Sequence, residues 1–136
     1  MTNITLFISV LICFICHCFV TNNVLLNIKI GIILLLYFYG LFTSFLNHGT
    51  KNEKYKKLDR ISMRILFIMN LILLTIIYYK NNNHINLIIC LYIILILSGL
   101  FYYCSKTYDI KTIGNVFHIC SHLLITFVNT FILYIF

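Results

Sequence analysis

The sequence predicts an all-α fold: a polytopic bundle of about five membrane-spanning helices. Of its 136 residues, 62% are hydrophobic and only 10% are charged, and the mean hydropathy is +1.01. A soluble domain of this length does not need so much apolar surface, so a membrane protein is the expected class. The apolar residues form long runs without period-two alternation and without a proline, which favours helices over the strands of a barrel.

Each apolar run is long enough to cross a hydrocarbon core of about 30 Å as a helix. The predicted spans are residues 4–20, 24–47, 61–79, 86–104 and 113–136. The segments between them are short, and none is a low-complexity linker. We therefore expect residues 1–136 to form a single integral-membrane domain.

The first run, residues 4–20, has two interpretations. It could be a secretory signal, but no Lys or Arg precedes it and the following CHCFVTNN offers no small-residue cleavage site. We expect a retained helix.

The six cysteines do not suggest an extracellular disulfide framework, because at least Cys13, Cys16, Cys90 and Cys120 fall within predicted spans. CFICH, which ends at His17, matches the C-x-x-C-H pattern of haem attachment. It lies inside an apolar helix, however, and we interpret its cysteines as small buried hydrophobes.

The net charge of +7 is distributed unevenly along the chain. Five basic residues separate the second and third spans: Lys51, Lys54, Lys56, Lys57 and Arg60. Lys106 and Lys111 separate the fourth and fifth. With five crossings both segments lie on one side, and an excess of Lys and Arg marks the cytoplasmic face. This predicts a cytoplasmic N-terminus and a lumenal or extracellular C-terminus, with the basic residues attracted to anionic headgroups and not to nucleic acid.

The last span carries a polar stripe, which is expected to face the bundle because ionisable groups are costly in lipid. At about 100° per residue, five side chains fall within about 80° of one another. They are Asn115, His118, His122, Thr126 and Asn129; Leu123, Leu124, Phe127 and Val128 point elsewhere, and Cys120 lies nearly opposite. Histidines at i and i+4 can offer two ring nitrogens to a metal. Two histidines hydrogen-bonded within the bundle fit the spacing equally well.

Polar residues of the second and third spans are expected at the same end of the bundle as His118 and His122. Ser44 and His48 lie four apart at the end of the second span, and Asp59 stands at the entrance of the third, with Met63 and Asn70 on its stripe. The five-span topology brings His48, Asp59, His118 and His122 to the cytoplasmic side.

Three imidazoles with an open position are typical of catalytic zinc. Asp59 could then orient a ligand or accept a proton, and Ser44 could hydrogen-bond a water or an oxyanion. Taken singly, Ser44 and Asp59 also fit helix caps.

This pattern resembles the alkaline ceramidase family, within the superfamily that includes Per1-like lipases, adiponectin receptors and hemolysin III proteins. The matching residues are Ser44-x-x-x-His48, ten residues (GTKNEKYKKL), Asp59-x-x-x-Met63, and His118-x-x-x-His122 followed by Leu123 and Leu124. The ten-residue interval favours the ceramidase or Per1-like branches. The family fold is a seven-helix bundle, so this chain would be a reduced, five-helix version with one helix where the family has three.

The resemblance implies that His48, His118 and His122 bind Zn²⁺ and that Ser44 and Asp59 position the water that attacks. The implied activity is hydrolysis of a lipid amide or ester bond, with a ceramide or other sphingolipid as partner, in an endomembrane of the ER or Golgi type. An alternative is a non-catalytic multi-pass protein that keeps the bundle, with or without the metal site. A proton or ion pathway fits less well, because the polar residues gather at one end. Association of two chains, to replace the missing helices, is left open.

Overall fold

The structure is a computed structural model, and it describes residues 8, 11–13, 15, 28–50, 52–80, 84–107 and 111–135. Four long helices follow one another: α2 (Ile28–Gly49), α3 (Glu53–Lys80), α4 (Ile85–Thr107) and α5 (Lys111–Ile135). Each is long and apolar enough to cross a membrane, and no strand occurs in the described ranges. The prediction of an all-α, multi-pass membrane fold is confirmed.

The first predicted span, 4–20, lies mostly outside the described residues. Its described positions, residues 8, 11–13 and 15, are helical. Cys16 and His17 of the C-x-x-C-H pattern also lie outside the described part of the chain.

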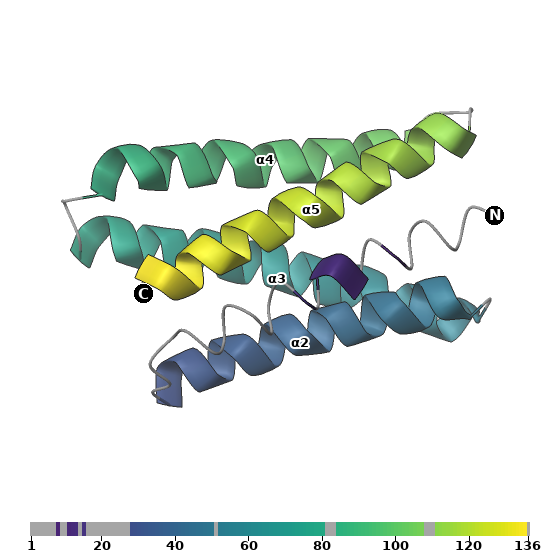
Figure 1. The fold of residues 1–136 in the computed structure, drawn as a ribbon, viewed down its shortest axis with the longest axis horizontal. Coiled ribbons are helices and arrows are strands. Elements are labelled where there is room, and N and C mark those ends of the chain that lie inside the picture. The colour runs from purple at the N-terminus through teal and green to yellow at the C-terminus, as the bar shows by residue number, and fades with distance from the viewer. Residues whose placement is uncertain are drawn as a thin grey trace.

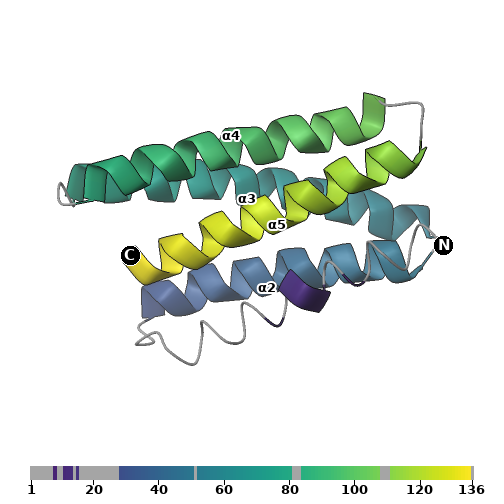
Figure 2. The same ribbon diagram turned by 45° about the horizontal axis from the view of Figure 1, so that its top comes forward.

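Each of the four long helices runs antiparallel to the next along the bundle (Figure 1). The ends of α2 and α4 and the starts of α3 and α5 therefore lie at one end of the bundle. Helix α5 runs between α4 and α2, in front of α3, in both views (Figures 1 and 2). This placement lets α5 face α3 and α4 at once.

Helix α3 begins at Glu53, eight residues before the predicted start of the third span at residue 61. The extra turns are charged, so hydropathy does not reveal them, but Glu, Lys, Leu and Arg are good helix formers. Asn52 caps the helix: its Oδ1 accepts a hydrogen bond from the backbone N–H of Lys54 at 2.9 Å, and its backbone oxygen accepts one from Lys56 at 3.2 Å. The expectation that Asp59 stands at the helix entrance is therefore wrong, because Asp59 lies in the second turn and is buried.

The apolar core draws residues from all four long helices, among them Leu34, Leu74, Leu91 and Ile132. Among the α5 residues expected to point away from the polar stripe, Leu123 and Phe127 are exposed and Val128 is fully buried. The reason is that α5 packs on two neighbours, so its buried surface is wider than the polar stripe.

Helices α2 and α3 approach closely at Gly40, where an added β-carbon would collide with the side chain of Leu66. At Gly31, earlier on the same helix, a β-carbon would meet nothing within 4 Å. Only Gly40 is needed for the helices to pack this closely.

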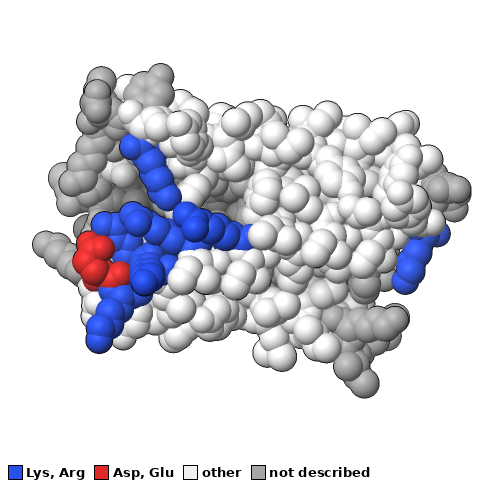
Figure 3. Space-filling view, turned by 180° about the vertical axis from the view of Figure 1, so that it is seen from behind, with Lys and Arg blue, Asp and Glu red and all other residues white. Residues whose placement is uncertain are grey.

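The positive charge gathers at one end of the bundle, as Figure 3 shows from behind. Lys54, Lys56, Lys57 and Arg60 lie in the first turns of α3, and Lys106 lies in the last turn of α4. The predicted asymmetry of charge is thus present in the folded chain.

Candidate metal centre

Three histidines from two helices meet near the basic end of the bundle. His48 comes from the last turn of α2, and His118 and His122 come from one face of α5. One ligand nitrogen from each lies within 4.8 Å of the others, and the ring centroids are 4.8 to 5.8 Å apart. Tetrahedral zinc with Zn–N bonds near 2.0 Å holds its nitrogens about 3.3 Å apart, so a small side-chain adjustment would let all three reach one ion. We call these three residues the histidine cluster.

The histidine cluster is shielded from solvent by the chain itself. His48 and His122 are 8% and 4% exposed, and His118 is half-buried. The Nε2 atoms of His118 and His122 lie 3.1 Å apart. The Nε2 of His48 is buried without any hydrogen-bond partner. A buried polar atom without a partner is costly, and a metal ion at this point would satisfy it.

Two hydroxyl groups lie beside the rings on α5. Ser105 Oγ is 3.5 Å from His118 Nδ1, which leaves Nε2 of the same ring directed toward the cluster. Ser44 Oγ is 3.5 Å from His122 Nε2. A hydrogen bond from Ser105 to Nδ1 would fix the orientation and tautomer of the His118 imidazole, whereas Ser44 contacts the His122 nitrogen that itself faces His118.

Ser44 lies five residues before the end of α2, in the helix interior, so it does not cap a helix. It is completely buried, and its hydroxyl faces α5. Of the two interpretations of Ser44, only a place beside the histidines fits this geometry.

Asp59 enters the site from α3. Asn47 Nδ2 donates a hydrogen bond of 2.6 Å to Asp59 Oδ2, while Asp59 Oδ1 is buried without a partner. The carboxylate is not one of the three groups whose ligand atoms converge. Its free oxygen is available to a water or a substrate group next to the histidine cluster, and it is not engaged in capping α3.

A cavity of about 380 Å³ opens beside the cluster toward the basic end. Its walls include His48, His118 and Asp59, and its outer part carries Lys56, Arg60 and Lys106. We call it the histidine cavity. The site therefore combines buried ligand atoms, an unpaired carboxylate oxygen and a positively charged entrance.

Sequence reasoning missed Asn47 and Ser105. Both are polar residues at the same depth as the histidines in otherwise apolar helix ends, which is the signal that could have revealed them. Cys120 stays outside the cluster, as expected, and His84 is exposed at the opposite end of the bundle.

A second group of polar side chains lies deeper in the bundle. Tyr37 donates its hydroxyl proton to Asn70 Oδ1 at 2.7 Å, and Asn70 Nδ2 donates to Asn129 Oδ1 at 2.7 Å. All three residues are buried. This amide cluster (Tyr37, Asn70, Asn129) ties α2, α3 and α5 together through hydrogen bonds made within the protein.

No protein-family model, no curated protein and no solved structure matches the chain. The resemblance to alkaline ceramidases therefore stays a prediction from the residues that carry it.

Proposed function

We propose that the protein is an integral-membrane, zinc-dependent hydrolase that cleaves an amide or ester bond of a membrane lipid, with a ceramide-type lipid as the first substrate to test. One observation carries the proposal: three imidazole nitrogens converge in a buried site, next to a carboxylate with an unpaired oxygen.

The donor set favours zinc. Neutral imidazole ligands suit Zn²⁺, and catalytic zinc sites keep three protein ligands with a fourth position open. Sulfur ligands are absent from the group of converging side chains in the described part of the chain. The histidine cavity, whose walls include His48 and His118, would give a substrate room to enter beside these ligands.

A bound zinc ion would polarise a carbonyl group and acidify a water molecule. The free Oδ1 of Asp59 is suited to accept a proton from water in the cavity, and Asn47 holds the carboxylate in place through Oδ2. The Ser44 hydroxyl lies beside His122 and would donate a hydrogen bond to the oxyanion that develops on the attacked carbonyl.

The charge distribution supports an orientation for the site. Lys and Arg prefer the cytoplasmic side, and the basic end carries the entrance of the histidine cavity. We propose that this end faces the cytoplasm in an endomembrane of the ER or Golgi type, that the N-terminus is cytoplasmic and that the C-terminus is lumenal or extracellular.

The test is hydrolysis by detergent-purified, zinc-equilibrated protein. A fluorescent ceramide and a fluorescent phospholipid serve as substrates, and release of the labelled fatty acid is measured. We expect turnover by the wild type and a loss of at least about 100-fold in His48→Ala, since this removes a metal ligand. His84→Ala removes an exposed histidine at the opposite end and should leave turnover unchanged.

Two outcomes would overturn the proposal. Protein that binds zinc and turns over neither lipid amides nor esters would favour the alternative, a non-catalytic membrane protein that keeps the metal site. Equal losses in His48→Ala and His84→Ala would show that the histidine cluster has no special role.

A further inference from the structure

A second cavity, of about 330 Å³, lies between α3, α4 and α5. On each of these helices it begins about one turn deeper than the histidine cavity. Along α3 the walls change from Asp59 and Arg60 to Arg64 and Phe67, and along α5 they change from His118 to Ile125. Tyr102 on α4 lines both. We call this second cavity the Arg64 pocket.

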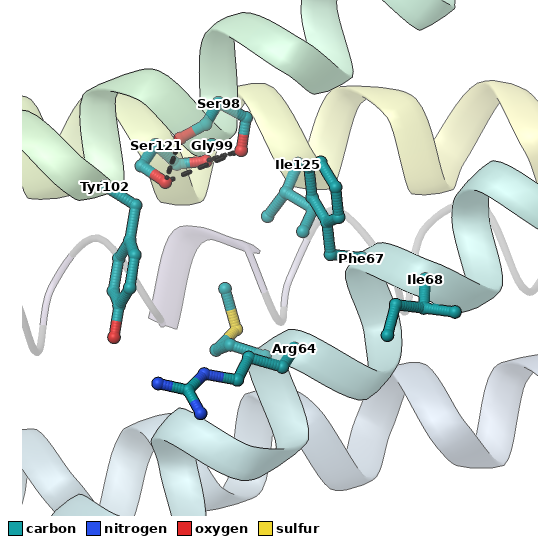
Figure 4. A pocket seen from close by; sticks show the side chains of 9 residues that line it. Arg64, Phe67, Ile68, Ser98, Gly99, Tyr102, Ser121 and Ile125 are labelled. Atoms are coloured by element: carbon teal, nitrogen blue, oxygen red, sulfur yellow. Dashed lines mark hydrogen bonds between the residues drawn. The ribbon is translucent and has the colours of Figure 1, made fainter.

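The walls of the Arg64 pocket are almost entirely apolar, and Arg64 is the only charged residue among the described residues that line them. Figure 4 shows the guanidinium of Arg64 and the ring of Tyr102 at one end, with Phe67, Ile68 and Ile125 toward the other.

Two serines in the wall do not make the deep end polar. Ser98 and Ser121 hydrogen-bond each other's backbone oxygens, at 3.2 and 2.9 Å, so their hydroxyls are already engaged. The deep part of the Arg64 pocket therefore suits hydrocarbon, and its volume lies at the lower end of the range for small-ligand sites.

Arg64 is placed where a cation is costly. As a helix of 28 residues, α3 is about 42 Å long, and a hydrocarbon core is about 30 Å thick. If the apolar part from residue 61 onward lies in hydrocarbon, Arg64 is about one turn below the headgroups. Charged side chains at such positions pair with another group or extend toward the interface.

No ion pair of Arg64 occurs within the described residues, where the only salt bridge joins Lys56 to Glu53. The Arg64 side chain is exposed. A partner from the surrounding bilayer fits this position, because phosphate groups of lipids lie at the level that the guanidinium can reach.

We infer that the Arg64 pocket binds a membrane phospholipid with an anionic headgroup, one acyl chain lying against Phe67, Ile68 and Ile125 and the phosphate pairing with Arg64. A net negative headgroup is favoured over a zwitterionic one because Arg60 and Lys106 lie just above. The inference does not rest on the proposed hydrolase activity or on a bound metal.

The experiment counts retained lipids on metal-free protein. The chain is reconstituted into nanodiscs with equal amounts of phosphatidylglycerol and phosphatidylcholine, and native mass spectrometry measures the lipids that stay bound. We expect phosphatidylglycerol to be enriched in the wild type and the enrichment to fall about five-fold in Arg64→Gln. Lys80→Gln removes one charge from the other end of the same helix and should keep the enrichment.

A second pair of variants tests the apolar end. Ile68 and Ile72 are 57% and 55% exposed on α3, but only Ile68 lines the Arg64 pocket. Ile68→Trp should displace the bound lipid, and Ile72→Trp should not. Both replace a lipid-facing side chain, so the fold should be preserved in each, as circular dichroism would verify.

Three results would overturn the inference: no enrichment in the wild type, equal enrichment in Arg64→Gln and Lys80→Gln, or equal lipid retention in Ile68→Trp and Ile72→Trp. In the second of these results, an equal loss of enrichment in Arg64→Gln and Lys80→Gln would indicate general attraction of the basic protein to anionic lipid.

Discussion

The histidine cluster and the amide cluster lie in the same bundle and both draw on helices α2 and α5, yet they differ in how their polar atoms are satisfied. In the amide cluster, Asn70 bonds both Tyr37 and Asn129. In the histidine cluster and its neighbour Asp59, two buried atoms have no partner, His48 Nε2 and Asp59 Oδ1. No other buried side-chain nitrogen or oxygen in the described part of the chain lacks one.

This difference distinguishes a structural cluster from a candidate functional site. Polar side chains that hydrogen-bond one another hold helices in register. A buried polar atom without a hydrogen-bond partner instead indicates a ligand that is not part of the chain. The four predictions that follow would sharpen or break this contrast, in order of decreasing effect.

Asp59→Asn tests the proposed catalytic role of the residue next to the histidine cluster. The amide keeps the size of the carboxylate but cannot accept a proton from water, so we expect turnover to fall about 100- to 10,000-fold while zinc content is retained. Lys80→Gln, at the opposite end of the same helix, should change turnover by less than about two-fold, because Lys80 does not line the histidine cavity. Loss of zinc in Asp59→Asn would instead make Asp59 a ligand.

Gly40→Ala tests the helix contact that lies between the two clusters. The added methyl group would meet Leu66, so we expect a loss of about 1–3 kcal/mol in the free energy of unfolding, measured by denaturant titration in detergent micelles. Gly31→Ala, on the same helix with open space, should change it by no more than about 0.5 kcal/mol. Similar values for both variants would show that the Leu66 side chain moves aside and that Gly40 is not required for the packing of α2 on α3.

Asn70→Leu tests the structural role of the amide cluster. It removes the hydrogen bonds that Asn70 makes with Tyr37 and Asn129, so we expect the free energy of unfolding to fall by about 1–2 kcal/mol. Zinc content should not change. Combining it with Tyr37→Phe should cost less than the sum of the two single variants, because both remove the same hydrogen bond. Zinc loss in Asn70→Leu would remove the distinction between the clusters.

Ser105→Ala tests the orientation of a ligand. Without the hydroxyl near Nδ1, the ring of His118 is held less firmly, and we expect zinc affinity to weaken by up to about ten-fold in a competition titration. Ser98→Ala is the matched control on the same helix, because its hydrogen bonds join α4 to α5 away from the histidine cavity. A larger effect from Ser98→Ala would assign both serines to packing alone.

Hydropathy alone was enough to predict the all-α membrane fold and the approximate place of α2, α4 and α5. It failed at the start of α3, where a capped, charged segment continues the helix beyond the apolar run. Apolar content measures what can lie in lipid, and helix formation continues wherever backbone hydrogen bonds and caps allow.

Helical spacing and topology together placed His48, His118 and His122 at one end, and the geometry brings their rings together. The roles of Asn47 and Ser105 could not be obtained in this way. Each acts on a residue of another helix, and such contacts depend on the rotation and depth of two helices relative to each other. The burial of Val128 was missed for the same reason: one helix considered alone does not show how many neighbours it will have.

The most direct test of the central claim is the zinc content of detergent-purified protein after equilibration with zinc and removal of the excess. We predict about one zinc per chain in the wild type and in His84→Ala, and almost none in His48→Ala or in the double variant His118→Ala with His122→Ala. Wild-type protein without stoichiometric zinc, or His48→Ala that retains it in full, would contradict the account.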